Sequence, residues 1–176
     1  MNRRLAQGVA TGPAASTSPT TVVIALGSNL GDRAALMAAA VADLHRLPLT
    51  TGVRVGPMIE SVAIRLDGPD EDAPAYLNTV ALAETRLAPS VLLSFLHRIE
   101  ADHGRERRER WGDRTLDLDL IAYGDVRSDA PELTLPHPRA AERSFVLRPW
   151  LALDPHAVLP GIGPVAELPA AREETS

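Results

Sequence analysis

Apolar positions in the first half of the chain follow the two-residue period of strands and then the longer period of a helix. Val22 to Leu26 is a short run of β-branched and aliphatic residues, which predicts a strand. An Ala- and Leu-rich stretch from about Asp32 to Leu47 predicts a helix capped near Asp32. Residues 50–65 alternate enough to predict one or two further strands. This half is therefore predicted to form a strand, a helix and then one or two further strands.

The second half repeats the alternation after a loop. Leu66 to Pro74 is rich in Asp, Gly and Pro, which predicts an exposed loop, and Tyr76 to Thr85 predicts a strand. Pro89 suits the first turn of a helix whose apolar spacing continues to His103–Gly104. Leu116 to Tyr123 alternates leucine with aspartate, the pattern of a strand with one wet face.

The order β-α-β-β-α-β is typical of a ferredoxin-like α+β domain, with helices packed on one face of a mainly antiparallel sheet. The proline-rich remainder predicts loops and a short helix around Ser144–Leu153. With 176 residues, we expect a single domain over residues 21–170. Residues 1–20 cannot build a periodic apolar face and are expected to form a disordered leader.

Composition narrows the classes of function. The mean hydropathy is -0.04, and no apolar run approaches the ~20 residues of a membrane-spanning helix. The absence of cysteine excludes disulfides, thiolate metal sites and a cysteine nucleophile. The first residues lack the apolar segment of a signal peptide, so we expect a cytoplasmic protein without a membrane partner. A net charge of -5 disfavours a nucleic-acid partner.

Asp117 and Asp119 are the strongest candidates for metal ligands. Residues two apart in a strand share a face, so both carboxylates are expected to point the same way, roughly 6–7 Å apart. Two like charges this close repel each other, which favours a cation between them. Oxygen ligands select Mg²⁺ or Mn²⁺, and Mg²⁺ typically adds water and substrate phosphates to one or two carboxylates. The alternative is an exposed edge strand whose aspartates pair with nearby arginines.

A cluster of positive charge precedes this strand. Five arginines lie within ten residues: Arg105, Arg107, Arg108, Arg110 and Arg114. Fixed positive charge suits phosphoryl transfer, and guanidinium groups bind phosphate in bidentate fashion. A solvated face neutralised by Glu106 and Glu109 is the alternative. Nucleic-acid binding is disfavoured, because Trp111 is the only aromatic residue interleaved with the cluster.

The remaining polar candidates are less specific. His97 and Glu100 are three residues apart on an expected helix, which suits a metal pair or, more simply, a polar helix face. His137 lies between two prolines and suits either a phosphate contact or a turn. Gly27–Ser28–Asn29 precedes a helix but has no GxxxxGK[ST] or GxGxxG pattern, so a tight turn with a helix cap is favoured over a phosphate loop.

Four segments in order resemble the 6-hydroxymethyl-7,8-dihydropterin pyrophosphokinase family of the folate pathway. They are Ala25 to Asp32, Tyr76–Leu77–Asn78, Arg110 to Ile121, and Leu133 to Pro138 followed by Arg143, Phe145 and Pro149. The resemblance covers residues from about 22 to 160. It implies a ferredoxin-like fold that transfers the β,γ-pyrophosphoryl group of ATP to the pterin hydroxymethyl oxygen and releases AMP. ATP and the pterin are the implied small-molecule partners, and we expect a monomer.

The resemblance also implies roles for individual residues. Asp117 and Asp119 match the aspartates that hold two Mg²⁺ ions, and Arg105 and Arg114 match arginines that steady the transferring group. The implied ATP-binding positions are His97, Glu100, Arg107, Arg110, Trp111, Thr134, His137 and Arg143. Trp111 would lie on a mobile loop from Gly104 to Gly112 that closes over the site. The implied pterin-binding positions are Ser61, Tyr76, Asn78 and Phe145, with the two aromatic rings on either side of the pterin.

Three positions depart from the family pattern. Asp113 replaces a proline, Glu132 stands where an arginine is common, and Ser61 to Arg65 lacks a Thr-x-Pro-x-Gly character. These departures motivate an alternative, a catalytically weakened paralogue that binds pterin or nucleotide without turnover. A metal-dependent phosphatase or nucleotidyltransferase would rest on the generic Asp and Arg set alone.

Overall fold

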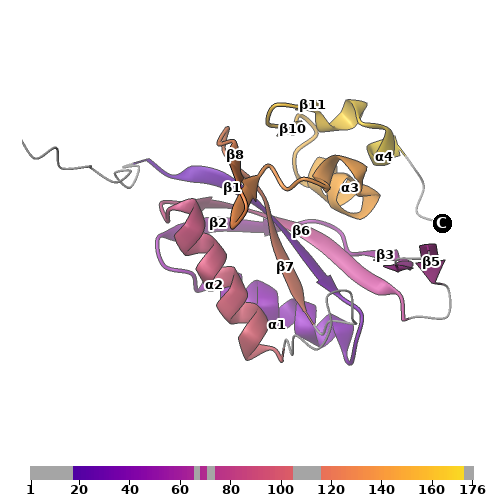
Figure 1. Cartoon of the computed structure of the whole chain (residues 1–176). Coiled ribbons are helices and arrows are strands. Elements are labelled where there is room, and N and C mark those ends of the chain that lie inside the picture. Colours follow the sequence, from indigo (N-terminus) through magenta and orange to yellow (C-terminus); the bar gives the residue numbers. More distant parts are fainter. Residues whose placement is uncertain (1–17, 66–67, 71–73, 105–115, 173–176) are drawn as a thin grey trace, which may run out of the picture.

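The computed structural model describes residues 18–65, 68–70, 74–104 and 116–172 (Figure 1). Its central sheet has the strand order β2-β6-β1-β7, with β3 paired to another part of β6. These strands are β1 (Thr20–Ser28), β2 (Thr50–Val55), β3 (Ile59–Ser61), β6 (Tyr76–Thr85) and β7 (Asp117–Tyr123). Every pairing in this sheet is antiparallel. The α+β class and the mainly antiparallel sheet predicted from the sequence are confirmed.

Two helices follow β1 and β6 and pack on the same face of the sheet (Figure 1). In α1 (Arg33–His45), Asp32 caps the N-terminus by accepting a hydrogen bond from the Ala35 amide at 3.0 Å, as the sequence predicted. In α2 (Pro89–Asp102), the proline occupies the first turn and Leu92 is among the buried residues. The apolar faces of both helices, with Met37 and Leu44 of α1, pack against the strands in one core.

The opposite face of the sheet is covered too, so the expectation of helices on one face alone was wrong. Helix α3 (Ser144–Leu153) lies there with α4 (Pro169–Arg172). Val80 of β6 and Ile121 of β7 are fully buried against this layer. Strands that are apolar on both faces need cover on both, because exposed apolar surface is unfavourable in water.

Short elements complete the described chain. They are β4 (Ala63–Arg65), β5 (Gly68–Asp70), β8 (Ser128–Ala130), β9 (Leu133–Leu135), β10 (Val158–Leu159) and β11 (Gly163–Pro164), with 3₁₀ turns at Ala140–Glu142 and Val165–Glu167. β5 pairs with β4, so part of the loop predicted from Leu66 to Pro74 forms a two-stranded ribbon. Pro69 is tolerated there because a two-stranded ribbon consists of edges alone.

The first and last described residues bear on the predicted leader and on the predicted domain limits. β1 begins at Thr20, the last residue of the predicted leader, while residues 1–17 lie outside the described part. The disordered leader and the domain limits of 21–170 therefore stay predictions. Among the described residues, no helix is long and apolar enough to cross a membrane.

Candidate functional site

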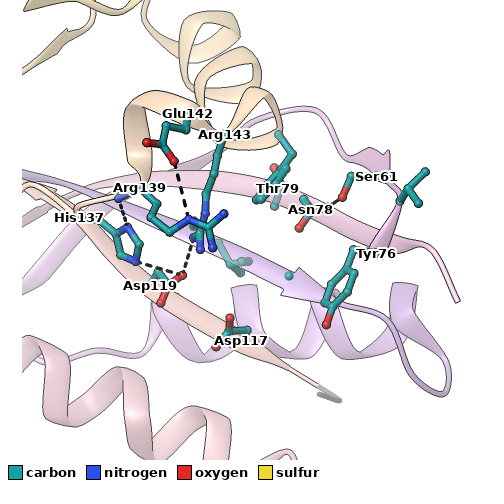
Figure 2. Close-up of a pocket in the computed structure, with 15 residues that line it drawn as sticks. Ser61, Tyr76, Asn78, Thr79, Asp117, Asp119, His137, Arg139, Glu142 and Arg143 are labelled. Atoms are coloured by element: carbon teal, nitrogen blue, oxygen red, sulfur yellow. Dashed lines mark hydrogen bonds and ion pairs between the residues drawn. The ribbon is translucent and has the colours of Figure 1, made fainter. Parts of the chain in front are cut away.

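A pocket of about 360 Å³ lies where three strand ends meet, on the α3 side of the sheet (Figure 2). Gly27, near the end of β1, pairs with Asn78 of β6 on one side and with Asp117 of β7 on the other. The pocket is lined by Ala25, Leu26, Gly27, Ser61, Val62, Tyr76, Asn78, Thr79, Asp117, Asp119, His137, Arg139, Glu142, Arg143 and Phe145. Residues from five separated segments thus meet in one place.

Asp117 and Asp119 lie on the same face of β7, as the two-residue period predicted, and both line the pocket. The Oδ2 atom of Asp119 lies 3.2 Å from Nη1 of Arg143, and the two side chains are 30% and 21% exposed, respectively. Figure 2 shows Asp119 between Arg143 and His137. As in the alternative interpretation, β7 is an edge strand of the sheet and Asp119 pairs with an arginine, but this pair is half-buried and lines a pocket.

A β-bulge in β7 places His137 beside this pair. The register between β1 and β7 shifts after Leu120, which leaves Ile121 without a partner residue in the ladder. The Ile121 carbonyl accepts a hydrogen bond from the His137 amide at 2.8 Å. This bond anchors the loop after β9, and Nε2 of His137 lies 3.8 Å from Oδ2 of Asp119.

The protonation of His137 follows from its surroundings. Its Nδ1 atom accepts a hydrogen bond from the Arg139 amide at 3.2 Å, so the neutral ring carries its proton on Nε2, facing Asp119. Burial lowers the pKa of His137 below its ordinary value; Asp119 opposes this change, and Arg143 adds to it. Near pH 7, His137 is therefore a neutral hydrogen-bond donor.

The other wall of the pocket carries an amide and two aromatic rings. Nδ2 of Asn78 donates to Oγ of Ser61 at 2.8 Å, and Ser61 pairs with Tyr76 in the β3–β6 ladder. Gly27 makes room for this wall: a Cβ atom there would stand 3.0 Å from Oδ1 of Asn78. Phe145, in the first turn of α3, has the Arg143 guanidinium 5.7 Å from its ring centroid, within the range of a cation–π contact.

Three described residues predicted to bind ATP lie away from this lining. Glu100 is 1% exposed, and its Oε1 atom accepts a hydrogen bond from the Leu118 amide at 2.8 Å. Thr134 donates through Oγ1 to the Ala130 carbonyl at 3.2 Å, and His97 is exposed on α2. Their roles in ATP binding stay predictions.

Five further predicted residues belong to the segment 105–115, which the structure does not describe. Arg105, Arg107, Arg110, Trp111 and Arg114 lie outside the described residues, as does the departure at Asp113. Glu132 is exposed in the turn before β9.

Sequence reasoning missed three polar residues of the lining. Oγ1 of Thr79 donates to the Gly56 carbonyl at 2.9 Å, which ties β6 to the segment after β2. Arg139 and Glu142 lie at the other wall, with Nε and Oε2 3.8 Å apart. Arg139 and Glu142 could have been found from the sequence, because both lie between His137 and Arg143, in a segment already singled out.

The carboxylates of the pocket suit a metal ion that is bound partly by the protein and partly by a substrate. Among the described residues, no group of three His, Asp or Glu side chains is arranged to hold a metal ion by itself. Two half-buried carboxylates on one strand match the one or two that Mg²⁺ takes when water and phosphate supply the rest. Asp117 and Asp119 therefore fit a magnesium–nucleotide complex better than a closed metal site.

Comparison with known proteins identifies the family. Residues 23–155 match the family model described as 7,8-dihydro-6-hydroxymethylpterin-pyrophosphokinase (HPPK). The chain belongs to the HPPK family. A 2-amino-4-hydroxy-6-hydroxymethyldihydropteridine pyrophosphokinase from Pseudomonas aeruginosa is 43% identical over 150 residues, which are 85% of this chain and 90% of that relative. The protein of the same name from Haemophilus influenzae is 40% identical over 148 residues, 84% of this chain and 90% of that relative.

A solved structure agrees on the fold of the HPPK family. A triple mutant of HPPK-DHPS from Plasmodium falciparum, crystallised with SDX-DHP, superposes with a TM-score of 0.62 at 12% sequence identity. The match covers 85% of this chain and 44% of that chain. At this identity the likeness supports the fold alone. Most described residues that the HPPK resemblance implied do share one pocket: Ser61, Tyr76, Asn78, Asp117, Asp119, His137, Arg143 and Phe145.

Proposed function

We propose that this chain transfers the pyrophosphoryl group of ATP to 6-hydroxymethyl-7,8-dihydropterin in folate biosynthesis, giving AMP and the pterin diphosphate. The observation that carries the proposal is that the pocket described above holds both sets of expected residues. It joins the residues expected for the pterin, on β3, β6 and α3, to those expected for metal and phosphate, on β7 and the loop before α3. Membership of the HPPK family supports the same reaction.

The wall formed by β3, β6 and α3 suits a flat, polar heterocycle. Tyr76 and Phe145 supply aromatic faces, which favour stacking on a ring. Asn78 is 5% exposed, and its amide is oriented by Ser61, so it can offer a fixed hydrogen-bond pattern to the ring edge. A cavity of about 360 Å³ is in the range of small-molecule sites. We assign the pterin to this wall.

The opposite wall suits the triphosphate. Asp117 and Asp119 would hold Mg²⁺, two ions in our proposal, which when bound would neutralise charge on the phosphate oxygens. The Arg143 guanidinium and Nε2 of His137 point at the same carboxylate, that of Asp119, in Figure 2, and both can turn to phosphate oxygens. A guanidinium can donate to Asp119 and to a phosphate at once, because it has five N–H groups. Arg143 would therefore both orient Asp119 and bind substrate.

The reaction requires one bond to form and one to break. The hydroxymethyl oxygen attacks the β-phosphorus, and the bond from that phosphorus to the α,β-bridging oxygen breaks, so the bridging oxygen leaves with AMP. The pocket aligns the two partners, which lowers the entropic cost of bringing them together. The hydroxyl proton passes to solvent, and we assign no described side chain as its base.

The test mixes the purified protein with Mg·ATP, with and without the pterin, and separates AMP from ADP. AMP that forms only with the pterin supports two-phosphate transfer in one step. ADP would indicate ordinary kinase or hydrolase chemistry, and the absence of both products would indicate a paralogue that binds without turnover. We further propose a cytoplasmic monomer; size-exclusion chromatography with light scattering tests the monomer.

A further inference from the structure

Arg33, the first residue of α1, joins the helix to two other segments. Its Nη1 atom donates to the Ala75 carbonyl at 2.5 Å, and its Nη2 atom donates to Oε1 of Glu60 at 2.9 Å. Ala75 directly precedes β6, and Glu60 is the middle residue of β3. Arg33 does not line the pocket. One guanidinium thus contacts the backbone of one segment and a side chain of another, at positions that are 15 residues apart in sequence.

Those two segments carry much of the wall to which we assign the pterin. Ala75 is followed by Tyr76, and Glu60 is followed by Ser61. Ser61 and Tyr76 pair in the ladder, and Ser61 accepts the hydrogen bond from Asn78. β3 has three residues and pairs with β6. So short a strand is weakly stabilised by its ladder alone, and further anchors matter.

We propose that Arg33 is a positioning residue that clamps β3 to the start of β6 and so sets Ser61, Tyr76 and Asn78 for the pterin. The inference rests on the proposed function, because it assigns this wall to the pterin. The bond to Ala75 is the stronger branch, since it is partly buried and charge-assisted. The Glu60 side chain is 64% exposed, so that ion pair contributes less.

The clamp can be removed without removing the helix. Asp32 caps α1, and its buried face consists of Met37, Ala40 and Leu44. None of these contacts depends on the Arg33 side chain. We therefore expect Arg33→Ala to disturb the wall and leave the remaining fold in place.

The first experiment measures steady-state kinetics of Arg33→Ala with either substrate varied. The pterin KM is expected to rise about tenfold, the effect of one charge-assisted hydrogen bond, while the ATP KM and kcat stay within about twofold. Arg33→Lys should restore part of the affinity, because an ammonium can still reach one acceptor. The matched control is Arg46→Ala, at the other end of α1, where Arg46 pairs with Asp43 and is 75% exposed. A pterin KM unchanged in Arg33→Ala, or both KM values rising together with a falling Tm, would overturn the inference.

A second measurement separates the clamp from the reaction. Amide hydrogen exchange of Arg33→Ala is compared with that of the wild type, and we expect faster exchange at Ile59–Ser61 and Tyr76–Asn78 with little change in β7. If the wild type neither forms AMP nor binds the pterin, the proposed function fails, and exchange alone then decides whether Arg33 holds the two segments. If the wild type is active while exchange and the pterin KM are unaltered, the inference about Arg33 fails and the proposed function stands.

Discussion

Asp119→Asn removes one negative charge from the pocket and keeps the size of the side chain. In the structure, Oδ2 of Asp119 lies 3.2 Å from Nη1 of Arg143. At an effective dielectric constant of about 20, two unit charges at this distance attract by about 5 kcal/mol. Desolvation of both groups offsets most of that attraction, and the amide oxygen of Asn can still accept a hydrogen bond from Arg143. We expect a net loss of about 1 kcal/mol in the free energy of unfolding, or about 2–4 °C in Tm.

The expected effect on turnover is far larger. If Asp119 binds magnesium in the reacting complex, loss of its charge weakens stabilisation of the transferring group by about 4 kcal/mol, and kcat falls about 10³-fold. The Arg143 ion pair by itself predicts no such loss. A small change in Tm with a large change in kcat is therefore the signature of a metal ligand.

The assay combines thermal unfolding with AMP formation over a range of Mg²⁺ concentrations. Asp129→Asn, an exposed aspartate in β8, is the matched control and should leave both quantities unchanged. If Asp119→Asn keeps more than a tenth of wild-type turnover with the same Mg²⁺ dependence, Asp119 only orients Arg143 and the reasoning is refuted. A fall in Tm well beyond the expected few degrees would instead assign the lost activity to unfolding.

Three further substitutions test other parts of the structure. Gly27→Ala places a Cβ atom 3.0 Å from Oδ1 of Asn78, so the pterin KM should rise several-fold with little change in Tm; an unchanged KM would contradict the tight fit. Phe145→Leu should weaken pterin binding by about 1 kcal/mol, roughly fivefold, and the ATP KM less, as measured by titration with each substrate. The hydrogen bond from His103 holds the pKa of Asp43 below its ordinary 3.8. The ionised Asp43 carboxylate therefore stabilises the fold fully above pH 3.8, and this stabilisation is lost as the pH falls through the lowered pKa. Asp43→Asn should cost under about 1 kcal/mol at pH 7 and flatten the fall of stability in acid, measured by urea unfolding.

Local periodicity was enough to predict most of the fold. The segments β1, α1, β6, α2, β7 and α3 all lie where apolar spacing and capping residues placed them. The second covered face was missed because the alternating pattern of β7 was interpreted as a strand with one solvent-exposed face. Asp117 and Asp119 are half-buried, but Ile121 beyond them is fully buried, and the bulge there brings Ala122 to the same side. A bulge depends on the partner strand, which local spacing cannot reveal.

The sequence predicted which residues belong to the site more completely than it predicted the contacts between them. The shared face of Asp117 and Asp119 follows from the strand period, but the pairing of Asp119 with Arg143 joins positions 24 residues apart, and no local pattern encodes it. Glu100 shows the opposite case. On a helix that reads as amphipathic, a glutamate suggests a polar surface, yet this one is buried because its carboxylate accepts the Leu118 amide of β7.

Core and site are linked through the register of β7. Leu118 faces the core shared with α1 and α2, opposite Leu26 in the ladder, and this burial sends the flanking Asp117 and Asp119 into the pocket. A slip of one residue would reverse both faces, placing two carboxylates in an apolar core at a cost of several kcal/mol each. The Leu118 amide is moreover bound by Glu100, which opposes such a slip. The apolar residues that stabilise the sheet therefore also fix the orientation of the carboxylates proposed to bind metal.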